Sequence, residues 1–350
     1  MNRYLSKEES TALKGVAILW MIFHHCYHET GLFDYLNLNF YPFDMESVLN
    51  VGIYAKVCVA IFAFVSGYGL YISYMNSAVI EGDSKWIWKR LKKVMTTFCT
   101  VAVISYVYFA IKALITGEEF FSKYGNSVSE IVISIAADIF GVSKLLDTRS
   151  LNGAWWYISA AIIFMIVAPA FYKLLNQFGS VFVIGVLIVL PRILKLEYFG
   201  QTSIYVYLEV FVVGMIACHA DWFGKFYRKF YKSSLAKAAT AVVLIALFVL
   251  SIHNNLLLSR KVFWEYHYIV VPLINIFLCI FVIFKIPGLK KVFAYLGKYS
   301  TVMWLVHIFY RNAMNAHVPD NTWFMITPIV LVVVSLVSAI IYDKVRGFLK

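Results

Sequence analysis

The first long apolar segment of the chain carries ionisable residues at both ends. It reads KGVAILWMIFHHCYHE, starting at Lys14 and passing through His24, His25 and His28. Lys14 and His25 are eleven residues apart, so in an α-helix both side chains lie on one face, about 16 Å apart along the axis. An imidazole is suited to general base catalysis, because its ordinary pKa is about 6.5. The spacing predicts a helix face that leads from a cation to a base.

Three histidines so close together also raise the question of a metal. His24 and His28 have the spacing of two zinc ligands on one helix, but the chain contains no HExxH motif and no evident third ligand. None of the five cysteines forms a CxxC pair. His28, next to Glu29, is expected at the outer interface, and His24 points about 100° away from His25. We therefore expect no metal and take His25 as the base.

A second apolar segment is interrupted by Ser66, Gly67 and Tyr68. A hydroxyl beside a glycine lets a ligand approach the backbone, and it equally lets another helix pack closely, as small residues do in membranes. No GxSxG motif is present, so a serine-hydrolase site is not indicated. The following WIWKRLKKV contains Arg90 and Lys93, which suit a polyphosphate ligand or an ordinary cytoplasmic anchor.

Further polar and aromatic residues stand in apolar segments. Glu209 and His307 are ionisable, and such residues within a membrane are functional candidates because burying them is costly. Trp155 and Trp156 begin another apolar segment, where they form either an interfacial belt or the mouth of a cavity.

The composition decides what kind of elements position these groups. Of the 350 residues, 61% are hydrophobic and 14% are charged, whereas a soluble domain is roughly half apolar and about a quarter charged. This composition indicates an all-α, polytopic membrane protein. The net charge of +12 comes from short basic loops without interleaved aromatics, so nucleic acid is not an expected partner; the lipid bilayer is.

Ten transmembrane helices are predicted. They are 11–28, 51–76, 94–115, 154–172, 179–194, 202–219, 235–253, 266–284, 299–315 and 323–343. The apolar piece 127–142 is short for a membrane that needs about 20 residues, and treating it as re-entrant or interfacial puts most of the 31 Lys and Arg residues on the cytoplasmic side. Both termini are then cytoplasmic, and residues 1–350 form a single domain.

Six sequence features in order resemble the acyltransferase 3 family, the integral-membrane O-acyltransferases that modify bacterial cell-surface glycans. The first is a basic residue and a glycine followed by a histidine eleven places after the base, here Lys14-Gly15 and His25. The others are a Phe-rich run into Ser-Gly-aromatic, a basic pair, a Trp-rich helix start, a Phe-x-x-Gly helix and a late Ser…His helix. They are represented by Phe62, Phe64, Ser66, Gly67, Tyr68, Arg90, Lys93, Trp155, Trp156, Phe211, Gly214, Ser300 and His307.

Two departures from the family pattern concern substrate handling. Many members have Arg in place of Lys14, and lysine does not make the bidentate contact of arginine. Many also carry a Trp…Glu element where this chain has Ala160 and Ala161. A sub-branch with different substrate handling is consistent with both differences.

The resemblance implies transfer of an acyl group, commonly acetyl, from cytoplasmic acyl-CoA to a hydroxyl of a surface glycan at a bacterial inner or plasma membrane, with no bound cofactor. It implies that His25 is the general base, that Ser66 and Tyr68 orient the acyl carbonyl or stabilise the developing oxyanion, and that Lys14, Arg90 and Lys93 hold acyl-CoA. Trp155, Trp156, Glu209 and His307 would line the substrate path. Direct and covalent transfer both stay open, as does the acceptor.

Two other classes of protein fit parts of the pattern. One is a transporter or flippase of a polar lipid, glycan or small molecule that uses the same polar path, although no inverted repeat is evident. The other is a sensory or scaffold membrane protein, which has little use for buried ionisable groups.

Overall fold

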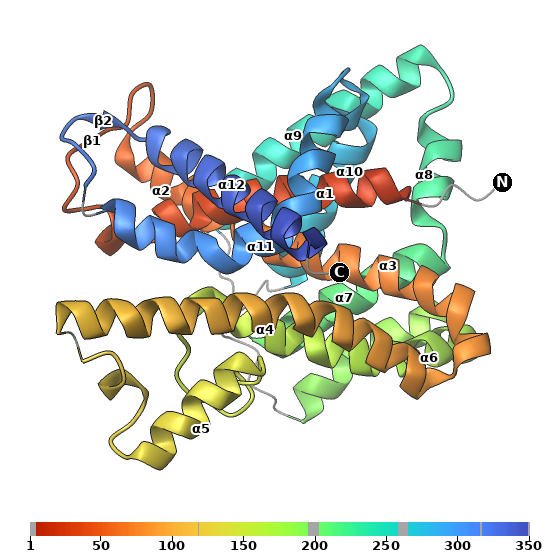
Figure 1. The fold of residues 1–350 in the computed structure, drawn as a ribbon. Helices are drawn as coiled ribbons and strands as arrows, with labels where there is room; N and C mark the ends of the chain where they lie inside the picture. Colours follow the sequence, from red (N-terminus) through yellow and green to blue (C-terminus); the bar gives the residue numbers. More distant parts are fainter. Residues whose placement is uncertain (1–4, 118, 195–202, 258–264, 316, 349–350) are drawn as a thin grey trace.

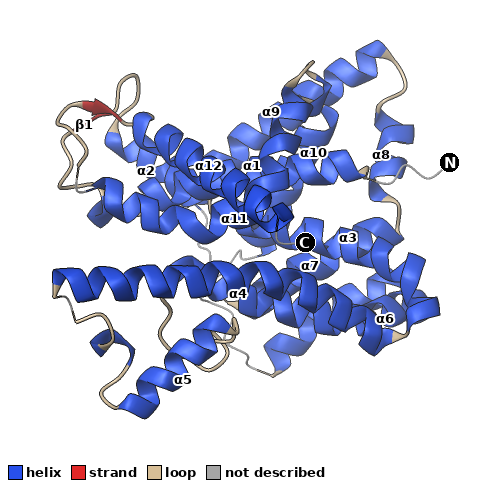
Figure 2. Cartoon of the chain, in the orientation of Figure 1, coloured by secondary structure: helices blue, strands red, loops and turns tan. Residues whose placement is uncertain are grey.

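The computed structural model describes residues 5–117, 119–194, 203–257, 265–315 and 317–348. These residues are mainly helical (Figure 2), and strands β1 (Leu38–Asn39) and β2 (Thr322–Trp323) pair in parallel over two residues each. The helices are α1 (Lys7–Tyr27), α2 (Met45–Tyr54), α3 (Val57–Glu81), α4 (Asp83–Thr116), α5 (Val128–Ile139), α6 (Trp156–Ile193), α7 (Ile204–His219), α8 (Trp222–Phe230), α9 (Ser234–Leu257), α10 (Val271–Phe281), α11 (Leu289–Asn315) and α12 (Ile326–Phe348). The expected all-α class is confirmed.

Several of these helices are long and apolar enough to cross a membrane. In the described part of the chain six meet this condition by length and composition, or seven if α7 and α8, bent by 59° at their junction, form one span. Helices α1 and α11, which carry Lys14, His25 and His307, are not among the six. The count of ten spans and the cytoplasmic termini stay predictions, and the first residue of the predicted span 202–219 lies outside the described residues.

Helix α6 shows how two predicted spans join. Its 38 residues would measure about 57 Å as one straight helix, far more than the roughly 30 Å of a bilayer core. The backbone leaves the helical conformation at Gly179, where φ is 77°. The helical parts before and after Gly179 overlap the predicted spans 154–172 and 179–194. By length and composition the structure gives one candidate span here, Gly153–Leu190, so the two separate spans stay a prediction.

Helix α5 covers the segment predicted to be re-entrant or interfacial. It has 12 residues, about 18 Å of helix, which is too short to span a membrane. Its buried Asp138 accepts hydrogen bonds from the Tyr106 hydroxyl at 2.8 Å and the Leu151 amide at 2.7 Å. Burial raises the pKa of this carboxyl. These bonds attach α5 to α4 beside the bundle (Figure 1).

Glycines bring two pairs of helices into backbone contact. A Cβ added to Gly15 of α1 would lie 1.9 Å from the Phe293 carbonyl oxygen of α11, and one added to Gly297 of α11 would lie 1.8 Å from the Thr11 oxygen of α1. Helices α3 and α7 meet in the same way through Gly67 and Gly214. The alternative that Gly67 serves helix packing is thereby confirmed.

The loops gather at two ends of the bundle. In Figure 1 the β1 and β2 segments lie at the left, whereas the N-terminal end of α1 and helix α8 lie at the right. Helix α1 runs between these ends, so its Lys14 and His25 lie at different depths of the bundle, as the helix rise requires.

Candidate active site

A large basic cavity opens among α1, α3, α4, α6, α11 and α12. It has a volume of about 730 Å³. Its lining contains six cationic side chains, which are Lys7, Lys14, Arg90, Lys93, Lys298 and Arg346. The acidic residue among the lining residues is Asp343, which is 3.5 Å from the Lys298 ammonium. The basic cavity is therefore suited to a polyanionic ligand.

The three cations predicted to bind the donor all line this cavity. Lys14 is half-buried and forms no ion pair with any described residue. The positive charge of Lys93 repels the Lys14 ammonium. Arg90 donates to the Ser73 hydroxyl, and its guanidinium lies 5.4 Å from the centre of the Trp86 ring. Lys93 is exposed. The cations thus extend from the exposed rim to the half-buried Lys14.

A much smaller cavity surrounds His25. This histidine chamber has a volume of about 20 Å³, room for about one water molecule. Its polar lining comes from His24, His25, Lys56 and Tyr157, with the Trp156 ring beside them. Among the residues that the structure describes, no group forms a hydrogen bond with the His25 imidazole, so none of them occupies its lone pair.

One wall separates the basic cavity from the histidine chamber. Met21, Phe62, Tyr157 and Trp304 line both. Met21 lies seven residues after Lys14 and four before His25, so the three share one helix face. The helix face predicted from the Lys14–His25 spacing therefore connects the two cavities.

Backbone carbonyls determine the tautomers of the neighbouring histidines. The Nδ1 atoms of His24, His28 and His307 lie 2.8, 2.8 and 2.7 Å from the carbonyl oxygens of Gly52, His24 and Trp304. A carbonyl oxygen only accepts, so each Nδ1 carries the hydrogen and each Nε2 carries a lone pair.

His307 lies directly beside His25. Their ring centroids are 4.9 Å apart. The His307 side chain is fully buried, and its Nε2 atom has no hydrogen-bond partner among the described residues. From the same helix α11, the Arg311 guanidinium donates to the His25 carbonyl oxygen at 2.9 Å. Helix α11 thus contacts both the ring and the backbone carbonyl of His25.

The three histidines of α1 and its C-terminus form a group that could hold a metal. One ring nitrogen from each of His24, His25 and His28 lies within 4.8 Å of the others. Two of these rings donate Nδ1–H to carbonyls, as metal-bound histidines usually do. The Lys56 ammonium in the same chamber opposes binding of a cation. The absence of a metal stays a prediction.

The two predicted hydroxyl groups lie in different places. Ser66 lines the basic cavity, close to the Tyr157 hydroxyl. Tyr68 lines neither cavity: its buried hydroxyl accepts a hydrogen bond from the Leu5 amide at 2.9 Å, and its ring packs against Phe223. The structure therefore brings Ser66 to the cavity and does not bring Tyr68 there, because the Tyr68 side chain points toward the α8 side of α3.

The predicted residues Trp155, Trp156 and Glu209 also lie in different places, and one of the three lines a cavity of the site. Trp156 lines the histidine chamber. Trp155, in the short 3-10 turn Gly153–Trp155 before α6, is buried and donates to the Leu305 carbonyl at 3.0 Å, which attaches this turn to α11. Glu209 is 4% exposed, and neither of its carboxylate oxygens has a hydrogen-bond partner among the described residues. It lines neither the basic cavity nor the histidine chamber.

Sequence reasoning did not include Lys56, Arg311 or Tyr157 among the site residues. A signal existed for Lys56, because it is a lysine inside the apolar segment 51–76. Arg311 and Tyr157 stand near helix ends, where such residues are common interface anchors. Only the contacts of Arg311 and Tyr157 in the folded protein distinguish them from ordinary interface anchors.

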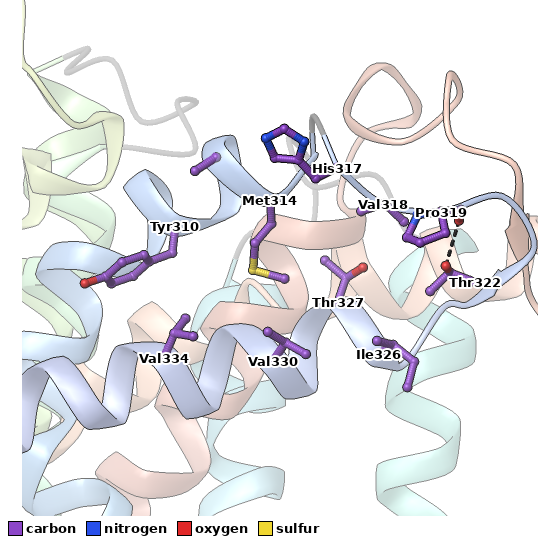
Figure 3. A pocket seen from close by; sticks show the side chains of 11 residues that line it. Tyr310, Met314, His317, Val318, Pro319, Thr322, Ile326, Thr327, Val330 and Val334 are labelled. Carbon is purple, nitrogen blue, oxygen red and sulfur yellow. Dashed lines mark hydrogen bonds between the residues drawn. The ribbon is translucent and has the colours of Figure 1, made fainter. Parts of the chain in front are cut away.

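A third cavity, of about 330 Å³, lies between the end of α11 and the start of α12. Figure 3 shows Tyr310 and Met314 facing Val330 and Val334 across it. Its lining is mainly apolar and contains none of the predicted site residues. The predicted site residues that line a cavity are therefore at the basic cavity and the histidine chamber.

The apolar helices define a multi-pass membrane protein with a basic cavity next to a buried group of imidazoles. The chain belongs to the acyltransferase 3 family: a family model described as an acyltransferase domain matches residues 8–343, nearly the whole chain. The match confirms the resemblance seen in the sequence. No curated protein and no solved structure matches the chain.

Proposed function

We propose that this protein is an O-acyltransferase of a bacterial plasma membrane that moves an acetyl group from cytoplasmic acetyl-CoA to a hydroxyl of a cell-surface glycan. The observation that carries the proposal is the single wall of four side chains shared by the basic cavity and the histidine chamber. A donor bound by its phosphates on one side presents its thioester to a base on the other.

The basic cavity supports the choice of donor. Coenzyme A carries a diphosphate and a 3′-phosphate, and Arg90 with the exposed Lys93 offers phosphate ligands at the rim. Lys14 lies deeper and directs the pantetheine arm toward Met21 and His25. The small histidine chamber favours a short acyl group such as acetyl.

The histidine chamber supports the choice of base. The His25 lone pair takes the proton of the acceptor hydroxyl as that oxygen attacks the thioester carbonyl. His307 accepts the N–H of protonated His25 through its Nε2 lone pair after a small ring rotation, which stabilises the imidazolium. Ser66, on the cavity side of the wall, orients the acyl carbonyl.

The test compares two histidine substitutions in purified, lipid-reconstituted protein. His25→Ala is expected to abolish transfer of labelled acetyl from acetyl-CoA to isolated surface glycans, while His253→Ala, an exposed position on α9, keeps wild-type transfer. Full transfer by folded His25→Ala eliminates His25 as the base. Absence of transfer by the wild-type protein to any glycan fraction rejects the proposed function.

A further inference from the structure

The last turns of helix α12 bring charged side chains to the basic cavity. Ala339, Tyr342, Asp343 and Arg346 line the cavity, and their spacing of three and four residues places them on one face of the helix. Arg346 is half-buried, whereas Lys344, two residues earlier, is exposed and does not line the cavity. A cytoplasmic anchor would account for either cation, so anchoring alone does not explain why Arg346 faces the cavity.

Helix α4 supplies the residues that Arg346 meets. Arg90, Lys93 and Thr97 line the basic cavity from one face of α4. The Arg346 guanidinium donates a hydrogen bond from Nη1 to the Thr97 hydroxyl oxygen at 3.2 Å. Lys93 and Thr97 are one helical turn apart, which separates their Cβ atoms by about 5–6 Å. The bond to Thr97 therefore places the guanidinium within about one turn of Lys93, so two cations from different helices lie close together on the cavity wall.

These three side chains keep donors for a ligand. A guanidinium has five N–H donors, and the contact with Thr97 uses one of those of Arg346. Among the residues that the structure describes, Arg346 and Lys93 form no ion pair, and the Thr97 hydroxyl donates to no acceptor. The Asp343 carboxylate, one turn before Arg346, lies 3.5 Å from the Lys298 ammonium. The positive charge of Arg346 and Lys93 is thus left for a bound anion.

The chemistry of this group matches a terminal phosphate. A phosphate monoester carries about two negative charges at neutral pH and three oxygens that accept hydrogen bonds. Arginine binds such a group in a bidentate fashion, and lysine adds a compact positive charge. Arg346, Lys93 and Thr97 together offer two cations and a hydroxyl, whereas Arg90 also donates to the Ser73 hydroxyl. In CoA the 3′-phosphate is the monoester, and the diphosphate lies between the adenosine and the pantetheine arm.

The position of Arg346 along α12 suits the nucleotide end of the donor. The Tyr27 hydroxyl, two residues after His25 in α1, donates to the Phe324 carbonyl just before α12 begins at Ile326. Arg346 lies 20 residues further along α12, which corresponds to about 30 Å of helix. The phosphate site therefore lies far from the histidine chamber, as an extended donor requires.

We propose that Arg346 is a specificity-determining residue that binds the 3′-phosphate of acetyl-CoA together with Lys93 and Thr97. The inference rests on the acyl-CoA donor of the proposed function. It extends that function by naming the residue that distinguishes CoA from a donor without this phosphate.

The experiment measures the affinities of CoA and 3′-dephospho-CoA for the lipid-reconstituted protein by titration calorimetry. Hydrogen bonds to charged groups change affinity by about 10- to 100-fold, so the wild-type protein should prefer CoA by such a factor. Arg346→Gln should lose most of this preference, because it weakens the binding of CoA and leaves that of 3′-dephospho-CoA within about twofold. Arg90→Gln should weaken both ligands, since both contain the diphosphate.

Lys344→Gln is the matched control, because it removes an exposed cation two residues away that does not line the cavity. Its preference for CoA should equal that of the wild-type protein. If Arg346→Gln does not fold, Arg346→Lys repeats the test, and it should lose part of the preference because lysine keeps the charge without the planar fork.

Three results overturn the proposal. They are equal affinities of the wild-type protein for the two ligands, an unchanged preference in both folded Arg346 variants, and an equal weakening of both ligands by Arg346→Gln. Acetyl transfer to glycans is measured separately on the same preparations. Selective binding of CoA through Arg346 by a wild-type protein that transfers no acetyl rejects the proposed function and leaves the assignment of Arg346 intact.

Discussion

Helices α1 and α11 hold the two sides of the site, and a single methyl group at Gly15 would push them apart. The Cβ of Gly15→Ala would lie 1.9 Å from the Phe293 carbonyl oxygen. Restoring an ordinary 3.4 Å contact requires a local separation of about 1.5 Å. The affected atoms belong to the backbone, so no side-chain rotation relieves the clash. Overpacking of this kind costs about 1–3 kcal/mol.

This separation acts on catalysis as well as on stability. Gly15 follows Lys14 directly, and α11 carries His307 and Arg311, which contact His25. A misplacement of about 1 Å at a reacting group costs on the order of 10²-fold in rate. We expect Gly15→Ala to lower acetyl transfer by about 10²-fold and to lower the unfolding temperature.

The assay measures transfer and thermal unfolding of Gly15→Ala in the same lipid preparation. Gly185→Ala is the matched control, because a Cβ there meets no atom within 4 Å and alanine favours the helix. Its transfer and stability should equal or exceed the wild-type values. Wild-type transfer and stability in Gly15→Ala would refute the close packing of α1 on α11 and the positioning argument that depends on it.

Three further predictions concern single residues. Arg90→Gln should raise KM for acetyl-CoA about tenfold, equivalent to about 1.4 kcal/mol of lost phosphate binding; an unchanged KM would remove Arg90 from the donor site. Ser66→Ala should lower kcat, whereas Tyr68→Phe should retain it, because the Tyr68 hydroxyl is bonded to the Leu5 amide and lines no cavity of the site; equal losses would contradict this assignment. Because burial raises the pKa of Asp138, its stabilising contribution is present below the unfolded pKa of about 4 and is lost as pH rises through the folded pKa. Asp138→Asn should therefore flatten the fall of unfolding temperature with rising pH, and an unchanged pH profile would exclude the carboxyl as its source.

Local rules were sufficient for part of the fold. Helix rise and periodicity predicted that Lys14 and His25 share a face, and Met21 between them confirms it by lining both cavities. Its short length and the placement of Lys and Arg in the loops predicted that the segment 127–142 does not span, and α5 has only 12 residues. The backbone break within α6 falls at Gly179, the first residue of the predicted span 179–194, with a φ of 77° that glycine adopts readily.

The contacts between distant helices could not be predicted in this way. Tyr68 follows Ser66 by two residues in α3, yet of these two only Ser66 lines the basic cavity. The contacts of each side chain depend on which elements pack against its face of α3. Lys56 was visible as a lysine in an apolar segment, but its position beside His25 depends on how the α2–α3 junction packs against α1 and α6.

The sequence by itself determined the family, the helical class and the line of polar residues along α1, because these depend on residue types and on the regular geometry within one helix. Only the tertiary structure decided that His307 stands beside His25, that four side chains line both the basic cavity and the histidine chamber, and that Lys56 enters the chamber. The physical reason is that these contacts join residues of different helices up to 286 positions apart in the chain, and close packing selects which helix faces meet.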